Sequence, residues 1–220
     1  MRVKLPDLIC FVIAVVSLSD GQVRPYFGVA GGVATVSADA GSRLSANSLN
    51  LSSYAPENGP AMNFFVGLPV QEYVNLQLNY ICNSNDLQLN SNSSNSSTFY
   101  QQERASVQRA AVLDALIYFR GRSRIRPYLG TGGGVAWLSS RQRRVISASR
   151  NAVPPPAEFS DIGPVLRVHV GIDAWLTGRL ALRYSFSDTI GQNAISKHLA
   201  PPGSRGMENF QNLFGFLVRF

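Results

Sequence analysis

Ser196, His198 and Glu208 are the residues of this chain whose types and spacing come closest to a hydrolytic triad. Ester hydrolysis of that kind needs a serine nucleophile, a histidine base and an acid that orients the histidine. The serine and the histidine are two positions apart, but Pro201 and Pro202 follow them, and a proline pair is typical of a loop. The sequence therefore favours a protein that is not an enzyme, with hydrolysis as an alternative.

A glycine-rich run, Gly130-Thr-Gly-Gly-Gly134, superficially matches a loop that cradles phosphate. Val135 stands where the dinucleotide-binding motif has its third glycine, and no amphipathic helix follows. The run instead indicates glycines that let a strand bend and pack closely. Two cysteines rule out a four-thiolate zinc site, and two histidines argue against a His-rich metal cluster. We expect no cofactor and no bound metal.

Polar and ionisable residues alternate with apolar ones in several β-rich segments, as Asn75, Gln77 and Asn79 do within 74–80. The residues expected to line the interior of a closed sheet are Asn75, Gln77, Asp114, Arg167, His169, Asp173, Arg183 and Arg219. Buried charges have to pair, because moving an unpaired ion out of water costs on the order of several kcal/mol. We therefore expect a structural salt-bridge network, with a narrow pore as the alternative.

Segments rich in β-branched and aromatic residues must position these side chains, and none has a convincing helical period. The expected strands are 24–36, 61–68, 73–81, 107–119, 125–138, 165–176, 180–186 and 209–220. The connections after the second, fourth and sixth strands are short. The others are long, at 37–60, 82–106, 139–164 and 187–208. Outer-membrane barrels sort their connections in this way, with short periplasmic turns and long extracellular loops.

The composition favours a membrane barrel over a soluble sheet. The chain is 45% hydrophobic and 15% charged, whereas soluble domains have about 25% charged residues. No internal run of about 20 apolar residues is present, which excludes a helical membrane protein. The expected fold is all-β: an eight-stranded antiparallel up-and-down transmembrane β-barrel with short periplasmic turns and four long extracellular loops. A soluble lipocalin-like barrel, the rival fold, would place its apolar residues inside.

Residues 1–21 are expected to form a cleaved signal peptide. A basic start is followed by a short apolar core at 8–16 and then by small residues. Cleavage is expected after Ser19 or Gly21, which leaves 22–220 as the barrel domain. Export of a barrel in this way predicts a place in the bacterial outer membrane.

One stretch of the chain nearly repeats itself. Arg24-Pro-Tyr-Phe-Gly-Val-Ala-Gly-Gly-Val-Ala34 matches Arg126-Pro-Tyr-Leu-Gly-Thr-Gly-Gly-Gly-Val-Ala136 at an offset of 102 residues. Each copy begins a strand that should run from the periplasmic side to the extracellular side, so the first and fifth strands should hold equivalent positions in the barrel. The two explanations are an internal duplication and similar strand environments that select similar residues.

The Arg-Pro-Tyr-x-Gly opening, the loop alternation and the closing segment 209–220 resemble the OmpA/OmpX-type small outer-membrane β-barrels, over residues 22–220. The resemblance implies that the barrel assembly machinery recognises the last strand, through Phe214, Phe216, Val218 and Phe220. Asn212 departs from that apolar pattern. No peptidoglycan-binding domain is expected after the barrel. Some small barrels modify lipid A, but 195–198 does not resemble their histidine motif.

Arginine is concentrated in residues 104–150, which contain ten arginines and one acidic residue, Asp114. The guanidinium fork matches phosphate well. The expected contacts are with phosphates of membrane lipids in the periplasmic turn and of lipopolysaccharide in the outer loop, through Arg122, Arg124, Arg141, Arg143 and Arg144. The alternative is a solvated charged loop. Nucleic acid is not an expected partner, because the sequence contains no base-stacking module.

The expected function is that of an outer-membrane β-barrel protein with a structural or surface-interaction role in the cell envelope. A narrow pore for small solutes or ions is the first alternative, and a lipid A-modifying enzyme is the second. The sequence identifies neither an extracellular partner nor an oligomeric state.

Overall fold

A computed structural model describes residues 24–38, 50–56, 58–93, 99–121, 123–148, 156–192, 194 and 206–220. The expected signal peptide, 1–21, lies outside these residues. Among them, no helix is long and apolar enough to cross a bilayer.

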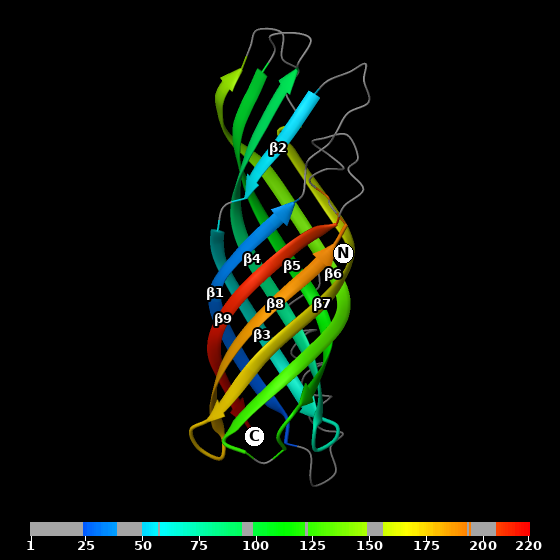
Figure 1. The fold of residues 1–220 in the computed structure, drawn as a ribbon, viewed down its shortest axis with the longest axis vertical. Helices are drawn as coiled ribbons and strands as arrows, with labels where there is room; N and C mark the ends of the chain where they lie inside the picture. Colours follow the sequence, from blue (N-terminus) through cyan, green and yellow to red (C-terminus); the bar gives the residue numbers. More distant parts are fainter. Residues whose placement is uncertain are drawn as a thin grey trace.

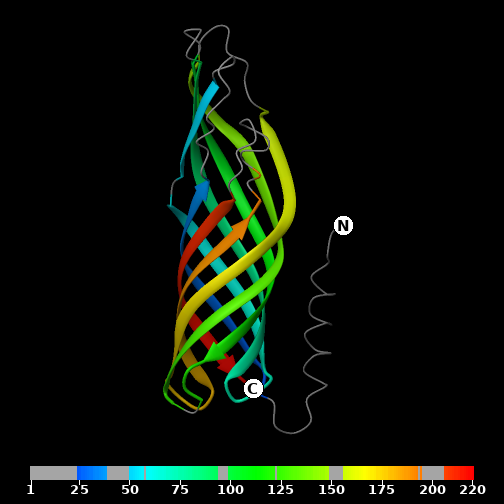
Figure 2. The same cartoon turned by 45° about the vertical axis from the view of Figure 1, so that its right-hand side comes forward.

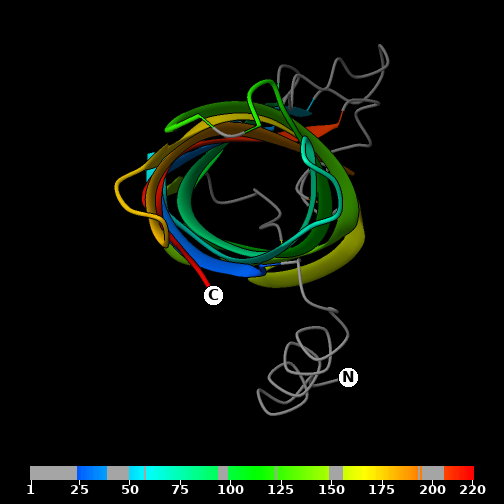
Figure 3. The same ribbon diagram turned by 90° about the horizontal axis from the view of Figure 1, so that it is seen from below.

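The described chain is a closed antiparallel β-barrel (Figures 1 and 3). Its strands are β1 (Tyr26–Ala38), β2 (Asn50–Pro56), β3 (Asn58–Pro69), β4 (Val74–Ser93), β5 (Phe99–Tyr118), β6 (Ile125–Ala148), β7 (Glu158–Trp175), β8 (Leu180–Gly191) and β9 (Met207–Arg219). The ring runs β4-β3-β1-β9-β8-β7-β6-β5 and returns to β4. β2 pairs with the far end of β4, beyond β3. The predicted eight-stranded up-and-down barrel is therefore confirmed.

The connections at one end of the barrel are tight, as predicted. The amide of Val70 donates to the Val74 carbonyl at 2.9 Å, and the amide of Leu176 donates to the Leu180 carbonyl at the same distance. The hydroxyl oxygen of Thr177 accepts from the backbone of Leu180 at 3.0 Å. These bonds satisfy backbone groups that the strand ladder leaves free.

The other end differs from the prediction, because much of the expected loop sequence is strand. β4 and β5 pair as far as Asn92 and Phe99, and β6 pairs with β7 as far as Arg141 and Glu158. Most positions on both faces of these extensions are polar, with Leu87 and Phe159 among the exceptions, so they lack the regular apolar alternation by which a strand is recognised in a sequence. Cross-strand backbone hydrogen bonds hold them instead. As a result, β4–β7 reach beyond β1, β8 and β9 (Figures 1 and 2).

The two faces of the wall are chemically opposite. The outward face carries large exposed apolar side chains, including Phe27, Val33, Phe64, Leu76, Leu113, Ile117, Leu129, Val135, Val170, Ile172, Tyr184, Phe214 and Phe216. The inward face carries buried polar and charged side chains, among them Asn79, Asp114, Arg167 and Arg183. A soluble lipocalin-like barrel would have the reverse arrangement, so this distribution contradicts the rival fold.

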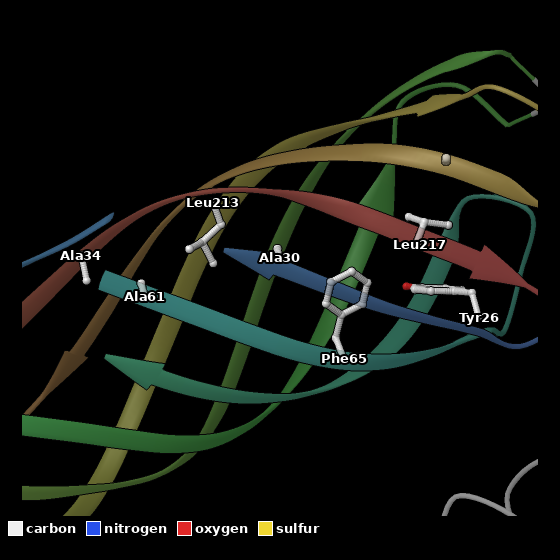
Figure 4. Close-up of a cluster of buried hydrophobic side chains, with 8 residues drawn as sticks. Tyr26, Ala30, Ala34, Ala61, Phe65, Leu213 and Leu217 are labelled. Atoms are coloured by element: carbon white, nitrogen blue, oxygen red, sulfur yellow. The ribbon is translucent and has the colours of Figure 1, made fainter. Parts of the chain in front are cut away.

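The interior also contains apolar clusters, which the prediction of a polar interior left out. Tyr26, Ala30, Phe65, Leu213 and Leu217 are buried together on β1, β3 and β9, and Figure 4 shows them on the inner side of these strands. An eight-stranded barrel has just enough room for side chains to fill it. Packed apolar groups therefore share the lumen with the polar ones.

The repeated stretch occupies opposite walls, since β1 and β6 lie four strands apart in the ring of eight. In each copy the tyrosine faces inward and pairs with a glycine on the next strand: Tyr26 with Gly67, and Tyr128 with Gly171. A Cβ atom added at Gly171 would lie 2.4 Å from the Tyr128 ring. The two copies thus repeat one packing arrangement, in which a ring covers a cross-strand glycine.

Candidate functional site

The polar network nearest the tight turns is centred on Arg183. Its guanidinium binds Asp173 through two bonds of 2.6 and 2.8 Å, and it also donates to the Tyr118 hydroxyl at 3.0 Å. A further bond of 2.5 Å reaches Gln77 on β4, which lies opposite β8 in the ring. The Tyr26 hydroxyl donates to Gln77 at 3.0 Å. The charge is thus neutralised, and its bonds span the whole lumen.

A second network lies around Asp114, whose side chain is fully buried. Asp114 accepts from Arg167 at 2.8 Å and from Asn79 at 2.9 Å, and His169 Nε2 lies 3.1 Å from the same carboxylate oxygen. Arg167 also donates to Ser187 on β8 at 3.2 Å. These contacts join β4, β5, β7 and β8 around one ion pair.

A third layer lies toward the extended strands. The amide of Asn209 on β9 donates to Gln108 on β5, directly across the ring. Asn85 donates to the Ala34 carbonyl at 2.9 Å. Beyond these polar bonds, one buried apolar cluster contains Val36, Leu87, Leu138, Phe159 and Met207, from β1, β4, β6, β7 and β9, together with Ala194, which lies between β8 and β9. Interior side chains therefore meet across the lumen at successive levels.

The structure brings together most of the residues predicted to face the interior. Asp114, Arg167 and His169 form one group and Gln77, Asp173 and Arg183 form the other, while Asn75 is buried on the same inner face of β4. Arg219 stands apart at the turn end, where its guanidinium lies 4.0 Å from the Trp175 ring centroid.

Sequence reasoning missed other residues that complete the networks. Tyr26 and Tyr118 supply hydroxyls to the Arg183 group, Ser187 accepts from Arg167, and Arg104 donates to the carbonyls of residues 156 and 157. The alternation that identified Asp114 also places Tyr118 and Arg104 on the inner face of β5. Extending the two-residue alternation to the aromatic residues, and into the segment expected to be a loop, would have placed Tyr118 and Arg104 in the interior.

The predicted lipid-phosphate arginines lie in different settings. Arg143 pairs with Asp86 at 2.6 Å and Arg144 pairs with Glu103 at 3.0 Å, both on the exposed surface. Arg141 lines a groove of about 600 Å³ together with Arg109, Trp137 and Ser139. Arg124 lies in the turn between β5 and β6, and Arg122 lies outside the described residues. Arg141 and Arg109 have no ion pair within the described residues.

The last strand presents its predicted assembly residues outward. Phe214, Phe216, Val218 and Phe220 are all exposed, Phe220 most of all at 71%. Asn212, which departs from the apolar pattern, also faces outward and accepts a 3.0 Å hydrogen bond from the Tyr184 hydroxyl. The polar side chain is thereby satisfied on the outer surface.

The structure describes only one of the three residues that could form a hydrolytic triad. Ser196 and His198 lie outside the described residues, and Glu208 lies on the exposed face of β9. Within the part of the chain that is described, no group of three or more His, Cys, Asp and Glu side chains is placed to hold a metal ion.

Comparison with known proteins supports the fold. No family model and no curated protein matches this sequence. Among solved structures, Neisserial surface protein A is 16% identical with a TM-score of 0.54, over 91% of this chain and all of the other. The outer-membrane protein OprG from Pseudomonas aeruginosa is 14% identical with a TM-score of 0.53, over 91% and 98%. AlkL, solved in lipid bilayers, is 12% identical with a TM-score of 0.50, over 90% of each chain. At these identities the likeness concerns the fold.

Proposed function

We propose that this chain spans the bacterial outer membrane and has a structural or surface-interaction role in the cell envelope. The observation that carries the proposal is the reversed distribution of side chains, with an apolar outer face and a charged, hydrogen-bonded interior. Exposed apolar surface of this extent is stable only against lipid or another apolar surface. Neisserial surface protein A, OprG and AlkL have the same fold, and OprG and AlkL are outer-membrane proteins.

The height of the apolar band suits a bilayer. On β7 the outward apolar positions run from Ile162 to Ile172, which covers the roughly 9–11 residues that a tilted membrane strand needs. Beyond the band, the outward face becomes polar, with Ser160 on β7 and Asp86 on β4. We place the tight turns in the periplasm and the extended β4–β7 wall outside the cell, as is usual for such barrels.

The filled lumen argues against transport as the main role. Arg183 and Asn209 each reach the opposite wall, and the Arg167–Asp114 ion pair lies between these levels. Opening a path would separate buried charges from their partners, which is costly. Single-channel recording on the reconstituted barrel should give no steady conductance. A reproducible open state would instead favour the narrow pore.

The outer groove is a candidate contact for lipopolysaccharide phosphate. Arg109 and Arg141 line it beside Trp137, at the outer edge of the apolar band. An aromatic ring suits the membrane interface, and an unpaired guanidinium there suits phosphate. Arg143 and Arg144 are engaged with carboxylates, so we assign the larger share of any such contact to Arg109 and Arg141.

The outward-facing phenylalanines of β9 support a role for the barrel assembly machinery during biogenesis.

The most direct test of the whole proposal is cell fractionation combined with an unheated and a heated gel. We expect recovery in the outer membrane, solubility only in detergent, and a mobility shift on heating. A protein that remained soluble without detergent would contradict the proposal.

The enzyme alternative has its own test. Cells with the wild-type chain and cells with His198→Ala should have identical lipid A acylation patterns. A change in acylation that His198→Ala abolishes would establish catalysis and overturn the assignment of a purely structural or interaction role.

A further inference from the structure

A cavity of about 420 Å³ lies at the tight-turn end of the barrel. Its lining comes from the β5–β6 turn and the start of β6, from the end of β7 and the β7–β8 turn, and from the end of β9. The lining residues that can contact a ligand through polar groups are Ser123, Arg124, Arg126, Trp175, Thr177 and Arg219. The cavity therefore brings Arg219 of β9 together with Arg124 and Arg126, which lie two positions apart in the chain. It lies at the turn end of the ring, which Figure 3 shows from below.

Aromatic rings, rather than carboxylates, hold two of these arginines. The Arg219 guanidinium lies 4.0 Å from the Trp175 ring centroid, and that of Arg126 lies 4.4 Å from the Tyr118 ring centroid. Arg126 also donates to the Arg120 carbonyl at 3.3 Å. Stacking on a ring fixes the plane of a guanidinium but leaves its N–H edges available for an anion.

The nearby acidic groups do not neutralise the cluster. Asp173 is the cross-strand neighbour of Arg126, but its oxygens are bound by Arg183 and the Tyr118 hydroxyl. Glu72 lies at the edge of the cavity, close to Gly121. Within the described residues, no ion pair joins any acid to Arg124, Arg126 or Arg219, so the cluster keeps an excess of positive charge.

Two buried donors of the lining residues also lack an acceptor. The indole nitrogen of Trp175 and Nε of Arg219 form no hydrogen bond within the described part of the chain. Buried donors are nearly always satisfied in folded proteins, and an exception indicates a missing partner. Positive charge, oriented guanidinium groups and unsatisfied donors are all matched by one kind of partner, an anion with several acceptor oxygens.

We propose that this cavity binds a phosphate group. Phosphate offers the oxygens that match a guanidinium fork, and the volume leaves room for the small group that a phosphate ester carries. The source is either the headgroup of an anionic phospholipid or a soluble phosphate ester. The periplasmic position of the site rests on the proposed membrane orientation, whereas the binding chemistry does not.

Trp175 is a built-in reporter, because the chain contains only two tryptophans. In the Trp137→Phe variant, refolded in neutral detergent, emission comes from Trp175 alone. Glycerol 3-phosphate should change this emission saturably at constant ionic strength, while sodium chloride should not. Arg126→Gln and Arg219→Gln should each weaken binding at least tenfold, with Arg219→Lys intermediate. Arg143→Gln, at the other end of the barrel, is the matched control.

The source is distinguished by a second titration, with phosphatidylglycerol vesicles against phosphatidylcholine vesicles. A response to phosphatidylglycerol that exceeds the glycerol phosphate response assigns the site to a lipid headgroup, and the reverse assigns it to a soluble ester. An absent response, or an equal response in Arg126→Gln, overturns the site. The heat-dependent gel shift verifies folding of each variant, so loss of the site is distinguishable from failure of the barrel or of its membrane location.

Discussion

At the scale of single residues, the interior is stabilised by charges whose partners come from several strands. Arg183 is satisfied by Asp173, Tyr118 and Gln77, so no one contact accounts for its burial. The exposed pairs, such as Arg143 with Asp86, are bound at similar distances but remain in water. Because solvent screens the exposed pairs, we expect very different energetic consequences from breaking the two kinds.

Replacing Arg183 by Met should destabilise the barrel by about 3–5 kcal/mol, because Asp173 would be left as a buried, unpaired charge. The measurement is urea unfolding in phospholipid vesicles, followed by tryptophan fluorescence. Arg143→Met serves as the control and should cost less than about 1 kcal/mol. Adding Asp173→Leu to Arg183→Met should recover part of the loss. Equal effects of the two arginine variants would argue against a paired interior.

The tyrosine–glycine pairs give a second test at this scale. In Gly171→Ala, the new Cβ would lie 2.4 Å from the Tyr128 ring and 2.6 Å from the Tyr184 carbonyl oxygen. Because the backbone oxygen cannot move freely, the cost should be about 1–3 kcal/mol in the same unfolding assay. Gly178→Ala is the matched control, since nothing lies within 4 Å of its added Cβ. Similar stability of both variants would show that the ring does not cover the glycine.

At the scale of elements, the sequence predicts the strands well where they have one apolar and one polar face. The eight ring strands and all three tight turns follow from alternation and from turn residues. The outer parts of β4–β7 do not follow from the sequence, because apart from a few residues such as Leu87 the segments 83–93 and 99–106 are polar on both faces. Their order depends on pairing with each other. Likewise, alternation places Asp114 inside but does not reveal that Arg167 and Asn79 reach it from other strands.

The outward face of β7 allows a test of depth along one element. Leu166→Arg, near the middle of the apolar band, should destabilise the reconstituted barrel by about 2–4 kcal/mol, because lipid does not solvate a charge. Ser160→Arg, on the same face beyond the band, should cost about 0–1 kcal/mol. Unfolding in vesicles measures both. If the two arginines were equally tolerated, the band would not be in contact with lipid.

At the scale of the whole molecule, the positions of the residues in the barrel explain the composition of the chain. The low share of charged residues reflects a wall that needs few of them outside, and many of the arginines lie at the two ends, such as Arg124 and Arg219 at one end and Arg143 and Arg144 at the other. The wall is longer on the β4–β7 side, so the outer end presents an asymmetric surface. Under the proposed structural or surface-interaction role, the outer surface and the two ends are the parts of the barrel available for contact.

Lipid contact along the apolar band is the central claim, and fluorescence quenching from within the bilayer tests it most directly. In a Cys82→Ser background, a fluorophore is attached to Leu113→Cys or to Glu103→Cys, both on the outward face of β5, and each protein is reconstituted into vesicles whose lipid tails carry a quencher. The account predicts strong quenching at position 113 and weak quenching at position 103. Weak quenching at both positions, in a barrel that still shows its heat-dependent gel shift, would contradict it.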